Sequence, residues 1–423
     1  MTGQLNGAAG AGALAGAASS LFSAPPADLL PPDLGCAPDD AALSAARVAA
    51  VAARDAAEID RDAVLPAAAI ATLKQHGLLG AMVPAAMGGA DASLAEIAAT
   101  ACTLGRACSA TAMIYAMHQI QLACLVAHGT DSVWHRRFLQ RVASEQLLLA
   151  SVTSEVGVGG DIRQSRCAVA TAGNTFALRK ESTAISYGRC ADALLITARR
   201  HDDAAPSDQV LVVAPRDTVR MDRTGGWNPM GMRGTCTEAF VVHAEGVLPQ
   251  VMPVPFGDIA SATMQPVSHV LWSALWIGIA ADALDRSRAF LRAGLRKGDG
   301  ALPPGGVRLV DAVASLQLLQ SQLRAWLVRL DARTGASLAA APLSLSETAE
   351  MNNLKVQASE TCLRVVQEAM LICGFAGYQN DSPFSLARHL RDLQSAPLMV
   401  NNDRIRASTA SLLLGPKLNL GIT

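Results

Sequence analysis

A change of pattern near residues 147 and 255 most constrains the fold of this 423-residue chain. Between these positions lie four short strand-like runs bounded by Gly, Asp and Pro: TFALRKE, ADALLITAR, QVLVVAPR and EAFVVHAEGV. Strands spaced this closely, with no helix between them, indicate an antiparallel sheet or barrel. On both sides of this region, apolar residues recur every three or four positions, which is the period of an amphipathic helix.

The chain is therefore predicted to be an α+β protein with three folded domains. We expect a flexible N-terminal arm over residues 1–37, because Pro and Gly are frequent there. A helical domain is expected over 38–147, a middle antiparallel β domain over 148–256, and a C-terminal four-helix bundle over 257–423.

Helix ends are predicted from local signals. Asp62, Asp91 and Ser109 lie near expected helix starts. The glycines and prolines of residues 77–89 predict a loop. In the C-terminal region long helices are expected over Met264–Leu295, Leu309–Ser337 and Ser346–Cys373, with a fourth helix near the end.

Composition excludes several classes of protein. Hydrophobic residues make up 51% of the chain, so it has enough apolar surface to fold. The formal net charge of -1 lacks the basic surplus that nucleic-acid binding needs. The apolar run Val270–Ala281 is too short to span a bilayer, so no membrane partner is expected. Nine cysteines without metal-ligand spacing predict no metal site and fit a reducing, cytoplasmic location.

Five segments in order carry a family resemblance: GLLGAMVPAAMGG (77–89), HGTDSVWHRRFLQRVASEQ (128–146), ASVTSEVGVGGD (150–161), MGMRGTCTEAFVV (230–242) and CGFAGYQNDSPFSLARHLRD (373–392). Together they resemble the acyl-CoA dehydrogenases over roughly residues 40–410. The resemblance implies FAD as cofactor and an acyl thioester of CoA or acyl carrier protein as substrate. It also implies a homodimer or homotetramer. The electron acceptor stays open between electron-transfer flavoprotein, a reductase and oxygen.

The glycine-rich segment also has a direct physical interpretation. A turn with Gly157, Gly159 and Gly160 lets backbone N–H groups approach a ligand closely. Ser154 and Ser186 offer hydroxyls to the edge of a flavin ring. The alternative is that the glycines form ordinary hairpins and the serines cap turns. By resemblance, the predicted cofactor residues are Val152, Ser154, Gly157, Gly159, Ala184, Ser186, Arg296, Gly374, Phe375, Asn401 and Asn402, and the predicted substrate residues are Gly160, His118, Ser268 and Val400.

The chain departs from the family where a base is expected. The family reaction removes an α-proton, for which a carboxylate is normally needed. Val400 falls on the position of that Glu, and Asn401 and Asn402 replace the Gly-Thr that follows it. Ser268 occupies the position at which a minority of members carry the base. His269 replaces a neighbouring Arg and is the candidate base, since imidazole titrates near neutrality; the alternative is a hydrogen-bonded histidine packed beside Trp272.

Two further features bear on function. Ala184 stands where the family usually has Trp or Phe near the flavin, which opens space beside the ring. His118 fits a family position near the wall of the active site, but a lone histidine on an apolar helix is more often structural. Three functions remain: dehydrogenation of an acyl thioester with a non-standard base, which the sequence favours; flavin-dependent monooxygenation in the same fold; and non-redox binding.

Overall fold

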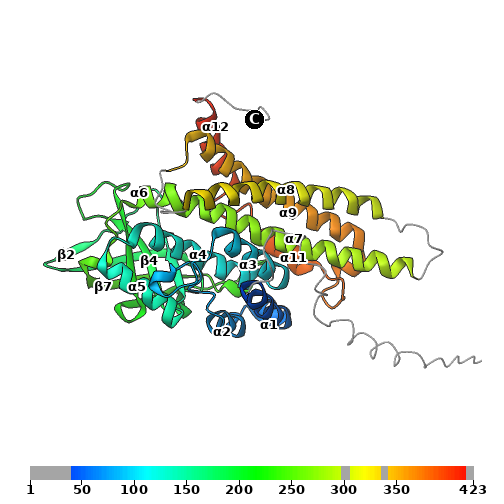
Figure 1. Ribbon diagram of the computed structural model, residues 1–423, viewed down its shortest axis with the longest axis horizontal. Coiled ribbons are helices and arrows are strands. Elements are labelled where there is room, and N and C mark those ends of the chain that lie inside the picture. Colours follow the sequence, from blue (N-terminus) through cyan, green and yellow to red (C-terminus); the bar gives the residue numbers. More distant parts are fainter. Residues whose placement is uncertain (1–39, 297–304, 335–341, 416–423) are drawn as a thin grey trace, which may run out of the picture. The chain divides into compact units, whose positions relative to one another are not determined.

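The computed structural model describes residues 40–296, 305–334 and 342–415 (Figure 1). The predicted arm, residues 1–37, lies outside these ranges. The N-terminal helices are α1 (Asp40–Asp62), α2 (Ala67–Gln75), α3 (Leu94–Ala107), α4 (Ser109–Gly129) and α5 (Val133–Glu145). Short 3-10 helices lie at Ala85–Met87, Gly188–Cys190, Arg216–Thr218, Arg233–Thr235 and Leu248–Gln250.

The predicted helix starts are right at one position and wrong at another. Ser109 is the first residue of α4. Asp62 is the last residue of α1, because the Ala-rich sequence continues the helix up to it, and α2 begins only after Pro66. Near Asp91, the N-cap of α3 is Ser93, whose side chain forms a capping box with Glu96.

Seven strands form the middle region in two sheets. The strands are β1 (Leu149–Val152), β2 (Ala170–Ala172), β3 (Thr175–Ile185), β4 (Ala193–Arg199), β5 (Gln209–Pro215), β6 (Val219–Gly225) and β7 (Glu238–Val247). One sheet has the order β1-β4-β5 and the other β2-β3-β7-β6. All pairings are antiparallel except β1 with β4, which is parallel. That pairing is possible because the long connection through β2 and β3 provides the crossover a parallel pair needs.

The C-terminal region is helical, as predicted. It comprises α6 (Phe256–Ile259), a π-helical turn (Ala260–Met264), α7 (Gln265–Leu295), α8 (Gly306–Thr334), α9 (Leu345–Cys373), α10 (Phe375–Tyr378), α11 (Ala387–Leu393) and α12 (Asn402–Leu413). Helices α7, α8 and α9 pack against one another and α12 packs on α9 (Figure 1). Residues 335–337 of the predicted second long helix lie outside the described ranges.

Two glycines let α3 and α7 approach closely. A Cβ on Gly105 would lie 2.4 Å from the carbonyl oxygen of Leu275, and one on Gly278 would lie 2.1 Å from that of Cys102. Any side chain there would force the two helices apart. This contact ties the N-terminal helices to α7, and the described residues from Asp40 onward form one compact unit.

Two segments, Ser109–Gly129 and Phe256–Leu295, are long and apolar enough to cross a membrane by length and composition. In each, 89% of the most apolar window is buried inside the protein. A helix that is apolar on all sides and covered by protein is typical of a core helix.

Candidate functional site

The glycine-rich turn after β1 has the backbone that its sequence predicts. Gly157, Gly159 and Gly160 have φ angles of 86°, 60° and 75°, in the left-handed region that favours glycine. All three are exposed, and a Cβ on Gly159 would meet nothing within 4 Å. The turn therefore offers accessible backbone to a ligand at Gly159. Arg404 of α12 donates from Nη2 to the Gly159 carbonyl at 2.6 Å, which links the turn to the C-terminal helices.

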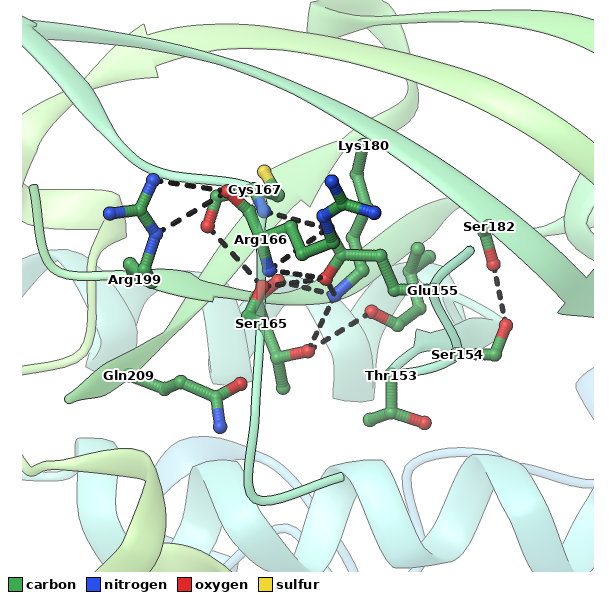
Figure 2. Close-up of polar contacts among 12 residues, drawn as sticks. Thr153, Ser154, Glu155, Ser165, Arg166, Cys167, Lys180, Ser182, Arg199 and Gln209 are labelled. Atoms are coloured by element: carbon green, nitrogen blue, oxygen red, sulfur yellow. Dashed lines mark hydrogen bonds and ion pairs between the residues drawn. The ribbon is translucent and has the colours of Figure 1, made fainter. Parts of the chain in front are cut away.

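A buried carboxylate anchors this turn to the β region. Glu155 accepts hydrogen bonds from Ser165 Oγ (2.7 Å), Arg166 N (3.1 Å) and Cys167 N (2.6 Å), as Figure 2 shows. Its Oε2 lies 3.5 Å from the buried ammonium of Lys180, whose pKa is lowered by burial. The glutamate that matches the family motif is therefore a structural group, because its oxygens are already engaged within the chain.

Ser154 is also engaged within the chain. Its Oγ lies 2.7 Å from Ser182 Oγ, donates to the Ala184 carbonyl at 2.9 Å and accepts from Ala184 N at 3.0 Å. One hydroxyl has one proton and two lone pairs, so these contacts use its full capacity. They hold the irregularity in β3 between Ser182 and Ile185. Its predicted contact with a flavin would require one of these bonds to be exchanged.

Val152, another predicted cofactor residue, is the last residue of β1. Its carbonyl accepts a long contact of 3.5 Å from the Thr197 hydroxyl.

Ser186 lies at the start of a row of hydroxyls that the sequence interpretation missed. Its Oγ is 2.8 Å from Thr237 Oγ1, which is 2.9 Å from Thr235 Oγ1. Thr235 in turn donates to the Met232 carbonyl at 2.9 Å. The signal was present in GTCTEAF, where two threonines two residues apart precede a strand. Next to this row Ala184 is exposed and presents only a methyl group.

His118 connects three parts of the fold. It is fully buried, and its Nε2 lies 2.7 Å from the Leu79 carbonyl, while Leu149 N donates to Nδ1 at 3.0 Å. Nε2 must therefore carry the proton of the neutral ring. Burial lowers the pKa of His118 to about 4. Both ring nitrogens bind backbone, so the geometry favours the structural alternative over the predicted substrate contact.

His269 does not have the setting of an accessible base. It is 2% exposed and its ring centroid lies 6.3 Å from that of Trp272. Burial, reinforced by the positive charge of Lys355, lowers the pKa of His269 to about 3, which a backbone hydrogen bond with Met351 opposes. Within the described residues Nδ1 has no hydrogen-bond partner. The neighbouring Ser268 donates back to the Met264 carbonyl at 2.5 Å and is also buried.

Lys355 is a buried lysine that the sequence interpretation missed. Its Nζ donates to the Asn402 Oδ1 at 2.7 Å and the Ala396 carbonyl at 3.2 Å, and lies 5.7 Å from the centroid of the Trp276 ring. Burial lowers the pKa of Lys355 to about 8. The sequence signal is a lysine four residues after the buried Met351, on the apolar face of α9.

The segment before α12 is held in an unusual conformation. Val400 has a φ of 50° and is 46% exposed. A β-branched residue in the left-handed region is strained, and such strain is found most often at functional sites. Asn401 caps α12 by accepting from Asp403 N and Arg404 N, and Asn402 is buried against Lys355. Both predicted asparagines thus shape the turn that presents Val400.

The remaining predicted cofactor residues lie elsewhere in the chain. Arg296 follows α7, about 40 Å along the helix axis from His269 at 1.5 Å per residue. Gly374 and Phe375 follow α9, and Phe375 is 83% exposed. The chain therefore brings together the glycine turn, the Ser186 region and the start of α12, but leaves these three residues at the far end of the bundle.

A cavity of about 370 Å³ lies beside the Ser186 region, because Tyr187 and Cys236 line it. Its lining residues are Ala63, Val64, Leu65, Tyr187, Arg189, Cys190, Cys236 and Glu238. None of the predicted site residues lines it. The Glu238 carboxylate pairs with Arg189 and Arg223, both at 2.7 Å.

Comparison with known families gives two matches. A family model described as the N-terminal domain of acyl-CoA dehydrogenase matches residues 42–146, and one described as the C-terminal domain matches residues 266–400. Together they cover more than half of the chain.

Individual relatives have low sequence identity to this chain. The chain is 24% identical over 365 residues to a cyclohex-1-ene-1-carbonyl-CoA dehydrogenase of Geobacter metallireducens, covering 85% of this chain and 92% of that protein. It is 27% identical over 357 residues to the amino sugar nitrososynthase DnmZ of Streptomyces peucetius, covering 80% and 84%. Among solved structures, FMN-bound TdsC from Paenibacillus sp. A11-2 has a TM-score of 0.78 at 16% identity, covering 90% and 98%.

Proposed function

Because this chain belongs to the acyl-CoA dehydrogenase family, we propose that it is a flavin-dependent oxidoreductase and that its reaction is a monooxygenation. The main support is that none of the three candidate positions offers a usable base: Val400 at the family's Glu position, Ser268 at the minority position, and His269 beside it. Position 400 is a valine, and at position 269 the histidine is 2% exposed with a pKa of about 3. A group with so low a pKa is a weak proton acceptor for the α-proton of a thioester.

The residues around the glycine turn fit a flavin. The accessible backbone at Gly159 can approach a phosphate or a ring edge. Ser186 has an oxygen that can accept a hydrogen bond. Ala184 is exposed and has only a methyl side chain, so it leaves room beside Ser186 for a ring. When bound and reduced, a flavin would supply two electrons to oxygen, with one oxygen atom entering the substrate and the other leaving as water. The chain's own residues would position the substrate and exclude solvent.

FAD is the form of flavin that the sequence predicts. The partners of this proposal are oxygen, a reductase that delivers electrons, and a small aromatic or amine substrate. The names of two similar proteins support it: DnmZ is an amino sugar nitrososynthase and TdsC is a dibenzothiophene monooxygenase.

Dehydrogenation of an acyl thioester is the second candidate. The similarity to a cyclohex-1-ene-1-carbonyl-CoA dehydrogenase over 92% of that protein favours it. In this case the substrate would be carried on CoA or acyl carrier protein, and electron-transfer flavoprotein could receive the electrons. His269 would then need a rearrangement that exposes its free Nδ1 to the substrate.

We also propose that the protein is a homodimer or homotetramer. By resemblance Arg296, Gly374 and Phe375 would contact a flavin, and they follow α7 and α9 at the ends away from the start of α12. Phe375 and Tyr378 are 83% and 71% exposed, and Leu371 is 60% exposed. An exposed apolar group of this kind at the end of a helix pair is suited to burial against a second copy. Light scattering on the purified protein gives the mass that tests this.

The deciding experiment compares two conditions on the purified, flavin-loaded protein. First, a panel of acyl thioesters is added without oxygen, and the flavin absorbance is followed. Second, amine and aromatic substrates are added with NADH, a flavin reductase and ¹⁸O₂, and the product mass is measured. Monooxygenation predicts one ¹⁸O atom in the product and no bleaching by any thioester. Bleaching by a thioester would establish the dehydrogenase instead, and failure to bind any flavin would reject both.

A further inference from the structure

The row of hydroxyls beside Ser186 has a single arrangement of protons that satisfies all of its contacts. From it we infer that Thr237 is a positioning residue that makes Ser186 Oγ a hydrogen-bond acceptor toward the bound flavin. The inference rests on the flavin-binding function proposed above. It concerns the chain's own hydrogen bonds, and its test separates failure of this inference from failure of the proposed function.

The direction of the row follows from its fixed end. The Met232 carbonyl can only accept, so Thr235 donates its single proton there at 2.9 Å. Thr237 must then donate to Thr235 across 2.9 Å, because Thr235 has no second proton. The proton of Thr237 is now used, so Ser186 must donate to Thr237 across 2.8 Å. Ser186 Oγ is left with lone pairs and no proton to offer a ligand.

The reverse direction is disfavoured. If Ser186 donated outward to a ligand, Thr237 would donate to Ser186 and Thr235 to Thr237. Thr235 Oγ1 and the Met232 oxygen would then face each other at 2.9 Å with lone pairs only. Two acceptors at that distance repel each other, and the hydrogen bond between them is lost.

The fixed end of the row is held by long-range contacts. Met232 N donates to Asp392 Oδ1 at 2.6 Å, and Trp227 Nε1 donates to the Met232 carbonyl at 3.2 Å. The strand end bearing Ser186 is tied to the same segment, since Tyr187 N donates to the Thr235 carbonyl at 2.8 Å. These bonds prevent the Met232 peptide from turning its carbonyl away, so the direction of the row is built into the fold.

An acceptor at this position has a chemical consequence. A flavin ring nitrogen that gains a proton on reduction carries a lone pair in the oxidised state and an N–H in the reduced state. An oxygen that only accepts stabilises the reduced state and repels the lone pair of the oxidised state. A row with this direction would therefore favour the reduced form of a flavin whose ring nitrogen faces Ser186, whichever of the two proposed reactions the protein catalyses.

The test removes the middle hydroxyl without changing side-chain shape. Thr237→Val keeps the branched volume but lacks the hydroxyl, so Ser186 regains a free proton and can donate to the oxidised flavin. Spectroelectrochemical titration of the purified holoprotein should show the reduced-to-oxidised ratio at fixed potential falling about tenfold, equivalent to about 30 mV for two electrons. Thr237→Ser keeps the hydroxyl and should stay near wild type. Thr224→Val, at an exposed threonine of β6, controls for the substitution itself.

The outcomes are distinct. If Thr237→Val and Thr237→Ser bind flavin with the wild-type potential, or if the valine variant favours the reduced state, the inference is wrong while the proposed function stands. If no form of the protein binds flavin, the proposed function fails. Should Thr237→Val not fold, Thr235→Val breaks the same row at its next member and must give a shift of the same sign.

Discussion

The buried position of His118 predicts that this one side chain makes the protein sensitive to acid. In the folded chain its pKa is about 4 because burial disfavours the charged ring. In the unfolded chain the ordinary value is about 6.5. Below pH 6.5 the unfolded chain therefore binds a proton that the folded chain does not, so the free energy of unfolding decreases as the pH falls from 6.5 toward 4.

The size of the effect follows from the two pKa values. Relative to neutral pH, His118 should reduce the free energy of unfolding by about 1.4 kcal/mol at pH 5.5 and about 2.5 kcal/mol at pH 4.5. His118→Gln keeps a donor and an acceptor near Leu79 and Leu149 but does not titrate. At neutral pH the variant should be less stable by roughly 1–3 kcal/mol, because the amide cannot reproduce both hydrogen bonds of the ring.

The assay is denaturant unfolding of both proteins at several pH values between 7.5 and 4.5. The difference in free energy of unfolding between wild type and His118→Gln should shrink as the pH falls and should be nearly closed at pH 4.5. Taking the difference cancels the other titrating groups. His201→Gln, at an exposed histidine, is the control. Parallel curves for wild type and His118→Gln would refute the reasoning; parallel curves with a raised KM would support the substrate contact predicted from the sequence.

Three further predictions follow from the charged side chains. Glu155→Gln should lower the free energy of unfolding by about 3–5 kcal/mol in denaturant, because it leaves the Lys180 ammonium buried and unpaired; adding Lys180→Met should recover part of the loss. Arg404→Ala should weaken flavin retention in dialysis with less than about 1 kcal/mol lost in stability, since its contact is exposed. Lys355→Met should raise the pKa of His269 in NMR titration. Between pH 7 and 9.5 the free energy of unfolding of wild type should rise by roughly 2 kcal/mol relative to that of this variant, because the buried ammonium of Lys355 deprotonates.

The fold could be predicted from the sequence because its signals are local. The helical period, the strand runs and the glycine turns each depend on a few neighbouring residues. Each of the four predicted strand runs overlaps a strand, whereas β1, β2 and β6 were not among the predicted runs. The parallel pairing of β1 with β4 could not be predicted, because it joins segments about 40 residues apart. The predicted helix start near Asp62 was wrong for a related reason. An aspartate favours a helix start, but the Ala-rich sequence before Asp62 continues α1 up to it.

The site was predictable in part. By resemblance the sequence predicts that Val400 replaces a carboxylate, and the structure adds that this valine has a left-handed backbone. What the sequence could not show is which polar groups are already engaged. Ser154 and His118 carry side chains suited to binding, yet their partners come from β3, from residue 79 and from β1. Such contacts exist only once distant segments are packed together.

This distribution of hydrogen bonds restricts where chemistry can occur. Glu155, His118 and Asn402 have their polar atoms satisfied inside the chain, so changing them tests the fold more than the reaction. Open capacity remains at the acceptor side of Ser186, the accessible backbone at Gly159 and the buried Nδ1 of His269, and the first two are suited to holding a cofactor. On the proposed monooxygenation, a site that retains binding capacity but has no exposed base at positions 269 and 400 would obtain its reactivity from the cofactor and its co-substrate. For this reason the oxygen experiment, and not replacement of His269, is the sharper test of function.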